Sequence, residues 1–353
     1  MSFKFTKMLD TNEQIIIDFL KVNQGVSSKE IHEAISSSVS YATVKRTLAK
    51  LVLQNFTTTQ GQRKATKYYV SKAYEVLYSV DLDKYYSFEI DERKIKKQFS
   101  FDLIREILSE INLFTKEELT KLNALQNQFE SNVKELSEAS YKKEFERLAI
   151  DLSWKSSQIE GNTYSLLETE LLLKEKQTAS GKTKDEAIML LNHKDALDFI
   201  LENPDYLIPL SLSKIEDIHK ILIKELGVDK NLRKRKVGIS GTNYVPLDNE
   251  FQIKEAVITM CDLINIKENI FEKALLALLL VSYIQPFMDG NKRTARILSN
   301  AILINYQYCP ISFRTVDTIE YKKAMLLFYE QNNVSRFKEI FITQFEFAVQ
   351  TYF

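Results

Sequence analysis

Glycine, proline and cysteine are scarce in this chain of 353 residues, which contains eight Gly, five Pro and two Cys. Few chain-breaking residues beside many Leu, Ile, Lys and Glu favour a mainly α-helical protein. Cys261 and Cys309 lie far apart in the sequence and lack a metal-binding spacing. We therefore expect free thiols in a reducing cytoplasm and exclude a disulfide-stabilised secreted domain.

Long apolar runs and an excess of one charge are also missing. The most apolar run, residues 274–284, is too short to cross a bilayer and is typical of a buried central helix. No signal peptide begins the chain, so we expect no membrane partner. With 48 basic and 48 acidic residues, the charge of the whole chain indicates no class of partner. The length allows two or three hydrophobic cores.

Charge is distributed unevenly near the N-terminus. Helical patterns over residues 12–23, 28–35 and 40–54 precede two strand-like runs around Gly61, an order that predicts a winged helix-turn-helix domain over residues 1–75. Residues 34–74 contain no Asp or Glu but seven basic residues, namely Lys45, Arg46, Lys50, Arg63, Lys64, Lys67 and Lys72. The segment resembles bacterial winged-helix regulators, with residues 40–48 as the recognition helix.

This N-terminal domain is predicted to bind DNA, because a basic face without carboxylates suits a phosphate backbone. Thr43, Lys45 and Arg46 would meet the major groove, and Arg63 and Lys64 at the wing tip would contact the neighbouring backbone. Winged helices also serve as protein-docking modules, and the sequence leaves that alternative open.

The middle of the chain, residues 76–150, is interpreted as a helical connector that packs on the C-terminal domain. Amphipathic helical patterns cover residues 101–113 and 115–150. The remaining residues, 151–353, contain the segment that carries the most chemistry, residues 285–296.

Residues 285–296 read Gln-Pro-Phe-Met-Asp-Gly-Asn-Lys-Arg-Thr-Ala-Arg. Gly290 permits a tight turn into a helix, whose first backbone N–H groups attract anions. Arg293 and Arg296 share one face of that helix, so both can reach one polyphosphate. Asp289 is a candidate Mg²⁺ ligand for the same group. The alternative is a glycine loop with solvated charges.

The same segment resembles the signature of Fic-domain proteins, His-Pro-Phe-x-Asp/Glu-Gly-Asn-Gly-Arg-x-x-Arg. It matches at Pro286, Phe287, Asp289, Gly290, Asn291, Arg293 and Arg296. The resemblance implies a helical Fic core that moves AMP from ATP, with Mg²⁺, to a Ser, Thr or Tyr hydroxyl of a target protein. The implied nucleotide-binding residues are Gly290, Asn291, Lys292, Arg293, Arg296 and Tyr321. For Tyr321, a role in the core is the alternative.

Gln285 stands where that family has the histidine that takes the proton from the attacking hydroxyl. An amide cannot accept a proton near neutral pH, and loss of a general base typically costs about 10²- to 10⁴-fold in rate. His219 could substitute if its helix crosses near the site, although a lone helical histidine is more often packed or solvated. The other histidines, His32 and His193, have no metal-binding spacing with it.

A second motif precedes the signature. Residues 156–162, Ser-Ser-Gln-Ile-Glu-Gly-Asn, resemble the inhibitory helix motif Ser/Thr-x-x-x-Glu-Gly/Asn of many Fic proteins. The motif begins at Ser156 and would lie on a helix. The resemblance implies that Glu160 of this helix pairs with Arg296 and keeps Arg296 from binding the γ-phosphate. A carboxylate matches the guanidinium fork and competes with phosphate. The alternative is a helix-end charge beside a glycine cap.

Two β-prone runs flank a Ser-Gly turn within residues 233–246. They occupy the place of the Fic flap, a β-hairpin that clamps an extended segment of the target by strand addition. By this resemblance Ile239, Gly241, Thr242 and Tyr244 would contact the target, while a structural connector is the alternative.

Two functions remain open. One is a Fic-type adenylyltransferase that is inhibited by Glu160 and weakened by Gln285. The other is an inactive, nucleotide-binding transcription regulator that acts through the winged helix. Both use ATP and Mg²⁺. Many Fic proteins self-associate, so a homodimer is a further partner implied by the resemblance alone.

Overall fold

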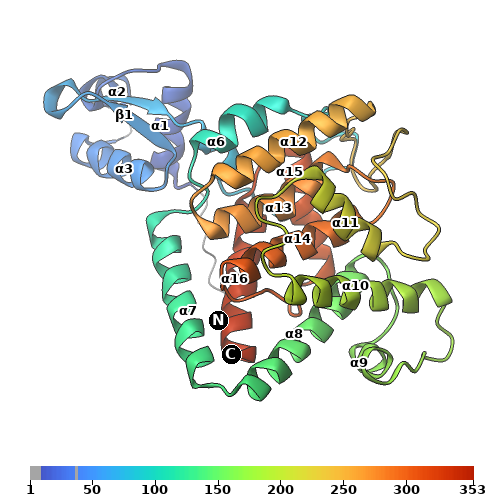
Figure 1. The fold of residues 1–353 in the computed structure, drawn as a ribbon. Helices are drawn as coiled ribbons and strands as arrows, with labels where there is room; N and C mark the ends of the chain where they lie inside the picture. The colour runs from blue at the N-terminus through green and yellow to red at the C-terminus, as the bar shows by residue number, and fades with distance from the viewer. Residues whose placement is uncertain (1–8, 36–38) are drawn as a thin grey trace.

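The computed structural model describes residues 9–35 and 39–353. A small N-terminal domain projects from a larger helical body, and the one strand pair among the described residues lies in that small domain (Figure 1). The prediction of a mainly α-helical protein is confirmed. Buried apolar residues of the small domain and of the helical body form one continuous cluster, so the connecting segments are packed and not free linkers.

The N-terminal domain has the predicted winged helix-turn-helix order. Its elements are α1 (Thr11–Val22), α2 (Ser28–Ile35), α3 (Tyr41–Leu53), β1 (Thr57–Gln60), a 3₁₀ turn (Arg63–Ala65) and β2 (Lys67–Val70). The strands pair antiparallel, and Val26 adds a single bridge to Tyr68. Ser40 caps α3 by accepting a hydrogen bond from the backbone N–H of Thr43.

The connecting region differs from the predicted pair of long helices. It comprises α4 (Ala73–Leu77), α5 (Leu82–Tyr85), a π-helical turn (Leu103–Ile107), α6 (Leu108–Glu110), α7 (Lys116–Glu135) and α8 (Glu138–Ile159). The pattern over 115–150 breaks at Leu136, whose backbone is extended, and Ser137 then caps a new helix. The proposed domain boundary at residue 150 therefore falls inside α8.

The helical body is built around a completely buried helix. Its elements after α8 are α9 (Leu166–Glu175), α10 (Lys184–Glu202), α11 (Leu212–Leu222), α12 (Glu250–Ile266), α13 (Ile270–Ile284), α14 (Asn291–Asn305), α15 (Thr318–Gln331) and α16 (Ser335–Tyr352). All residues of α13 from 271 to 284 are buried, which confirms the central helix expected from the apolar run. It packs along α14 in the middle of the body (Figure 1).

The flap, residues 233–246, has the expected turn at Ser240 and Gly241 but no hairpin. Its second limb pairs elsewhere, because the backbone N–H of Val245 donates to Lys97 O (2.8 Å) and Val245 forms a parallel bridge with Gln98. In the first limb, Arg233 donates from Nε to Gln285 O (2.6 Å) and also bonds Leu247 O. These contacts replace the ladder that two paired limbs would have formed.

Among the described helices, none combines the length and the apolar composition that a bilayer crossing requires.

The buried position of α13 leads to a stability prediction. Leu278→Ala removes a side chain with 0% exposure, so we expect a loss of about 2–5 kcal/mol in the free energy of unfolding, from lost transfer energy and a residual cavity. Leu167→Ala, at a side chain that is 72% exposed on α9, is the matched control and should change stability little. Equal losses in chemical denaturation would contradict the central role of α13.

Candidate functional site

The signature forms a tight loop between the two central helices. α13 ends at Gln285 in the left-handed region (φ 52°), and α14 begins after Gly290, which also has a positive φ of 80°. A Cβ added at Gly290 would lie 3.2 Å from Ile223 and 3.4 Å from His219. The backbone angle therefore favours glycine at this position, and the two neighbouring side chains leave little room for a Cβ.

Asn291 holds the loop closed from inside. Its side chain accepts from the backbone N–H of Phe287 (2.8 Å) and donates to Gln285 Oε1 (3.0 Å). The Gln285 amide donates in turn to Ser282 O (2.7 Å). The polar atoms of Gln285 are thus engaged in bonds that fix the loop, and its side chain holds no titratable group.

Arg293 carries buried donors that lack a partner. One terminal nitrogen bonds Asp289 Oδ2 at 3.0 Å, whereas Nε and the other terminal nitrogen are buried without a hydrogen-bond acceptor. Burial lowers the pKa of the Arg293 guanidinium, and the carboxylates of Asp289 and Glu160 counter that effect. Unpaired buried donors on a charged group are costly, so this position fits an anion such as phosphate.

Arg296 is completely buried and has every donor group engaged. Its Nε donates to Ser156 Oγ (2.9 Å), one terminal nitrogen donates to Tyr321 Oη (3.3 Å), and the other donates to Ser156 O (2.9 Å) and to Glu160 Oε1 (2.8 Å). Helices α8, α14 and α15 therefore converge on one guanidinium. Among these acceptors Glu160 alone is charged, so it is the one that an anionic ligand would replace.

Glu160 ends α8 and contacts two cations at once. Besides Arg296, its Oε2 lies 3.6 Å from Lys292 Nζ. Burial opposes ionisation of this carboxyl, but the attraction of Arg296 and Lys292 outweighs burial and holds its pKa below the ordinary value. Glu160 is thus a paired charge, not merely a helix-end charge beside the glycine cap, although Gly161 does follow in the left-handed region (φ 102°).

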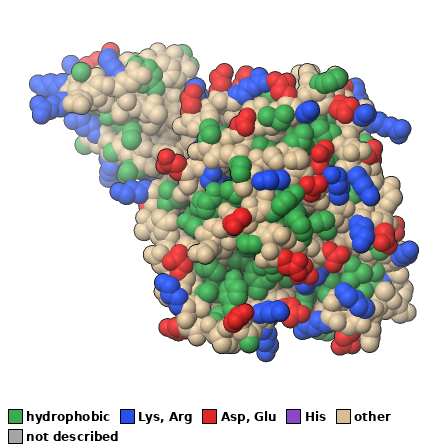
Figure 2. All heavy atoms as spheres, viewed as in Figure 1, with side chains coloured by type: hydrophobic (Ala, Val, Ile, Leu, Met, Phe, Trp, Pro, Cys, Tyr) green, Lys and Arg blue, Asp and Glu red, His purple; other side chains and the backbone are tan. Residues whose placement is uncertain are grey.

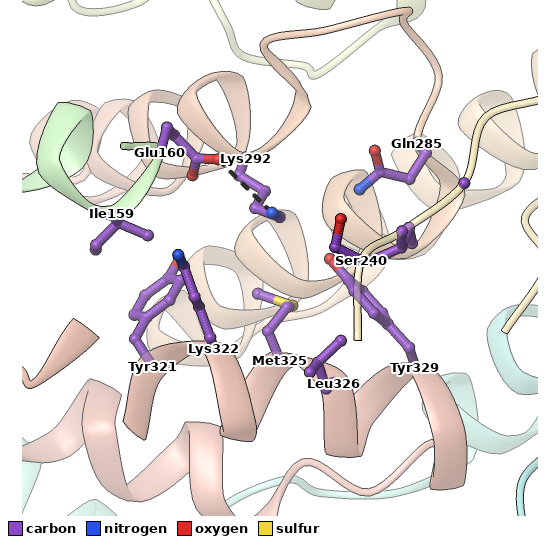
Figure 3. A pocket seen from close by; sticks show the side chains of 12 residues that line it. Ile159, Glu160, Ser240, Gln285, Lys292, Tyr321, Lys322, Met325, Leu326 and Tyr329 are labelled. Atoms are coloured by element: carbon purple, nitrogen blue, oxygen red, sulfur yellow. Dashed lines mark ion pairs between the residues drawn. The ribbon is translucent and has the colours of Figure 1, made fainter. Parts of the chain in front are cut away.

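A cleft of about 340 Å³ opens beside this ion pair. Its walls are Ile159, Glu160, Gly238, Ile239, Ser240, Gln285, Lys292, Tyr321, Lys322, Met325, Leu326 and Tyr329. Figure 3 shows Glu160 and Lys292 on one side, Gln285 and Ser240 on the other, and the α15 side chains along the floor. The cleft joins the signature, the inhibitory-type motif and the flap, three segments that lie far apart in the sequence.

Asp289 fits a magnesium ligand that acts together with phosphate. Its carboxylate accepts from the backbone N–H of Gly290 (2.6 Å) and from Arg293, yet its side chain is 64% exposed. The described residues contain no group of three or more His, Cys, Asp or Glu side chains placed to hold a metal. A single carboxylate plus phosphate oxygens and water is the coordination that Mg²⁺ commonly takes.

His219 packs against the signature loop. Its ring stacks on Phe287 with centroids 3.6 Å apart, and its Nε2 donates to Asp289 O at 2.9 Å. Burial lowers the pKa of His219 to about 4. The ring supports the backbone of the signature loop, which fits the alternative of a packed histidine.

α15 supplies cleft residues that sequence patterns missed. Tyr321 is buried and bonds Arg296, so it is both a core residue and a cleft wall. Met325, Leu326 and Tyr329 follow four, five and eight residues after Tyr321 on the same helix. Tyr244 corrects a prediction, since it is buried against Tyr283 and its hydroxyl donates to Tyr283 O (3.0 Å). It supports the flap from below and does not face a target.

The basic face of the winged helix is partly neutralised. Lys50, Lys67 and Lys72 pair with Glu13, Glu30 and Glu110, respectively. Among the described residues, no carboxylate pairs with four exposed basic side chains, namely Lys45, Arg46, Arg63 and Lys64. Lys and Arg side chains gather at the outer end of this domain (Figure 2).

The predicted recognition residues lie on two neighbouring elements of that domain. Lys45 and Arg46 belong to α3, and Arg63 and Lys64 form the turn at the wing tip. Lys45 Nζ also lies 4.9 Å from the centre of the Tyr41 ring. Thr43 is half-buried and its hydroxyl bonds Ser40 at 2.9 Å, so it helps to begin the helix.

Comparisons with known proteins agree with both halves of this description. Residues 209–303 match the model of the Fic/DOC family, and residues 9–128 match that of the penicillinase repressor family. Protein adenylyltransferase Fic of Nematostella vectensis is 30% identical over 175 residues, which cover 48% of this chain and 40% of that protein. Protein adenylyltransferase fic-1 of Caenorhabditis elegans is 27% identical over 173 residues, or 47% and 34% of the two chains.

Solved structures establish the fold. Fic-1 of C. elegans (residues 134–508) superposes with a TM-score of 0.57 at 20% identity, covering 67% of this chain and 72% of the other. A Fic domain containing signaling protein from Bacteroides thetaiotaomicron gives 0.56 at 20% identity, with 65% and 94% covered. The helical body therefore has a Fic fold. The chain spans less than half the length of the curated relatives named above.

The buried His193, which is near Arg293 and Arg296, leads to a prediction of how stability depends on pH. Burial, together with Arg296 and Arg293, holds the pKa of His193 well below its ordinary value, and Ser153 Oγ lies 3.2 Å from Nδ1. In the unfolded chain the His193 imidazole takes up a proton near pH 6.5, whereas in the folded chain it stays neutral. The free energy of unfolding therefore falls as the pH drops below about 6.5. His193→Gln should lose less stability than wild type between pH 7 and 5 in urea denaturation. Equal slopes would contradict a neutral His193.

Proposed function

We propose that the chain is a Fic-type protein adenylyltransferase whose nucleotide site is closed by Glu160 and whose transfer step is weakened by Gln285. The observation that carries the proposal is the clamp at Arg296, where Glu160 occupies one guanidinium edge at 2.8 Å. The two relatives named above are protein adenylyltransferases by name, which supports the proposed activity independently of the structure.

ATP would bind with its phosphates over the N-terminus of α14. Arg293 offers two buried donors without an acceptor, and α14 begins after Gly290 with no side-chain cap on its first N–H groups. Lys292 and Arg296 would also bind the phosphates once their ion pairs with Glu160 are broken. Asp289 would hold Mg²⁺, which would supply positive charge to offset the phosphate charge.

A target hydroxyl would attack the α-phosphorus, forming the new O–P bond while the bond to pyrophosphate breaks. Ile239, Gly241 and Thr242 of the flap would present the target, with Ser240 beside the cleft. The hydroxyl proton must leave during attack, and Gln285 cannot take it. Proton release to water in place of a positioned base typically costs about 10²- to 10⁴-fold in rate.

Transfer can be measured directly with α-labelled ATP. The Glu160→Gly protein should bind ATP with Mg²⁺ more tightly than wild type and label itself slowly, because the competing carboxylate is gone. Adding Gln285→His to Glu160→Gly should raise labelling by about 10²- to 10⁴-fold, the usual contribution of a general base. Glu175→Gly, at the exposed end of α9, is the matched control for the first change.

The result separates the two candidate functions. Labelling of the Glu160→Gly protein with Gln285 in place supports an enzyme. No label without the histidine, despite ATP binding, supports a regulator. If none of the variants binds ATP, the nucleotide site itself is wrong.

The second candidate is a nucleotide-sensing transcription regulator. It is favoured by the exposed, unpaired basic residues of α3 and the wing, and by a Gln285 amide whose bonds serve the loop. In this function DNA binds the winged helix, and occupancy of the cleft is the signal. The match of residues 9–128 to the penicillinase repressor family supports the same proposal.

DNA binding is tested by removing charge from α3. Lys45→Ala with Arg46→Ala should weaken binding of a duplex and lower the slope of log K against log salt by about two, since two phosphate contacts are lost. Lys142→Ala with Lys143→Ala removes two exposed lysines from α8 and serves as the control. Equal effects in a salt titration would mean that the winged helix offers no specific DNA face.

A further inference from the structure

The segment between the winged helix and the helical body, residues 82–98, crosses the flap and the end of α15; we call it the strap. It begins with α5 (Leu82–Tyr85) and continues without regular structure to Gln98. Sequence patterns assigned it no role beyond connection. In the structure it contacts two walls of the cleft, the flap and α15, which are not joined to each other by β-ladder hydrogen bonds.

On one side the strap holds the flap at three points. Asn243 Nδ2 donates to Asp91 Oδ1 (2.8 Å), Arg93 donates to Gly241 O (2.8 Å), and the backbone N–H of Val245 donates to Lys97 O (2.8 Å). The bond at Gly241 falls at the turn itself. These bonds explain why the second limb of the flap pairs with the strap.

On the other side the strap holds the C-terminal end of α15. Arg93 pairs with Glu330 Oε2 at 3.2 Å, and the exposed fractions of the two side chains are 4% and 1%. Tyr85 donates to the same carboxylate oxygen (2.7 Å), and Tyr86 donates to Lys323 O (2.7 Å). The Arg93 guanidinium also lies 5.1 Å from the centre of the Tyr86 ring.

Arg93 therefore joins the two walls with one side chain. Gly241 adjoins Ser240, and Glu330 adjoins Tyr329, and both Ser240 and Tyr329 line the cleft. A buried ion pair adds little net stability, because desolvation of the two charges offsets their attraction. The rigid, planar fork of a guanidinium can however fix the separation of two acceptors, whereas an ammonium on a flexible stem holds them less precisely.

We propose that Arg93 is a positioning residue for the target, because it sets the place of the flap turn relative to α15. The proposal rests on the proposed function, in which the flap presents a hydroxyl to the nucleotide. Arg93 belongs neither to the residues that line the cleft nor to the signature, so in this proposal it acts through Gly241 and not on the reacting atoms.

The test compares Arg93→Lys with a control arginine. Lysine keeps the positive charge beside Glu330 but loses the second arm to Gly241 O, so folding is preserved while the turn is released. Arg105→Gln removes an exposed guanidinium that pairs with Glu255 on α12, outside the strap. Both changes are made in the full chain, with Glu160→Gly and Gln285→His present for the assays with ATP.

Hydrogen exchange is the first measurement and needs no nucleotide. In Arg93→Lys the amide of Val245 should exchange about tenfold faster or more, as expected for loss of a hydrogen bond from a charged donor. Amides of α13 should stay unchanged, and Arg105→Gln should leave both regions alone. Unchanged exchange at Val245, or an equal increase in α13, overturns the proposal.

Self-labelling kinetics give the second measurement. Arg93→Lys should lower the maximal rate while the ATP concentration at half-maximal rate stays within about threefold, since the flap orients the acceptor and does not hold ATP. A shift in that concentration with an unchanged maximal rate overturns the proposal. If the parent protein binds no ATP, the proposed function fails, and exchange at Val245 still decides whether Arg93 positions the flap.

Discussion

The fold of the candidate site depends on one buried charge. Arg296 has no exposed surface, so its guanidinium must find its partners inside the protein. α8 supplies Ser156 and Glu160, and α15 supplies Tyr321. A neutral set of acceptors would leave the charge uncompensated, and the carboxylate completes the set. Phosphate can replace a carboxylate at a guanidinium, so under the proposed function the contact that stabilises the site would also oppose ligand entry.

Under the proposed function, anion binding and proton transfer are separate tasks at this site. The anion-binding features, Arg293 with free donors and a helix N-terminus behind Gly290, are all in place. The residue at the position of the base is an amide that holds the loop through Asn291 and Ser282. A phosphate-binding framework can therefore persist without the group that drives transfer, because the two depend on different atoms.

The flap shows that a local pattern can indicate a β-prone segment without indicating which segment it pairs with. Its β-prone limbs and its turn were evident, but strand propensity does not say which edge a strand will join. The strap, some 150 residues earlier in the chain, offers a carbonyl to Val245 and a guanidinium to Gly241. Tyr244, the residue before Val245, is buried and stacks with Tyr283 and Tyr329, so its side chain is part of the core.

Local sequence alone determined most of the helices, the winged-helix order and the Gly290 turn, because caps and periodicity act over a few residues. The pairing of Glu160 with Arg296, 136 positions apart in the chain, was expected from the resemblance to Fic proteins and not from a local pattern. Tertiary structure decided what depends on helices meeting. It directed His219 to a backbone carbonyl, brought Met325, Leu326 and Tyr329 into the cleft, and paired the second limb of the flap with residues 97 and 98. Side chains far apart in sequence become neighbours only when the core packs, so no local pattern could place them.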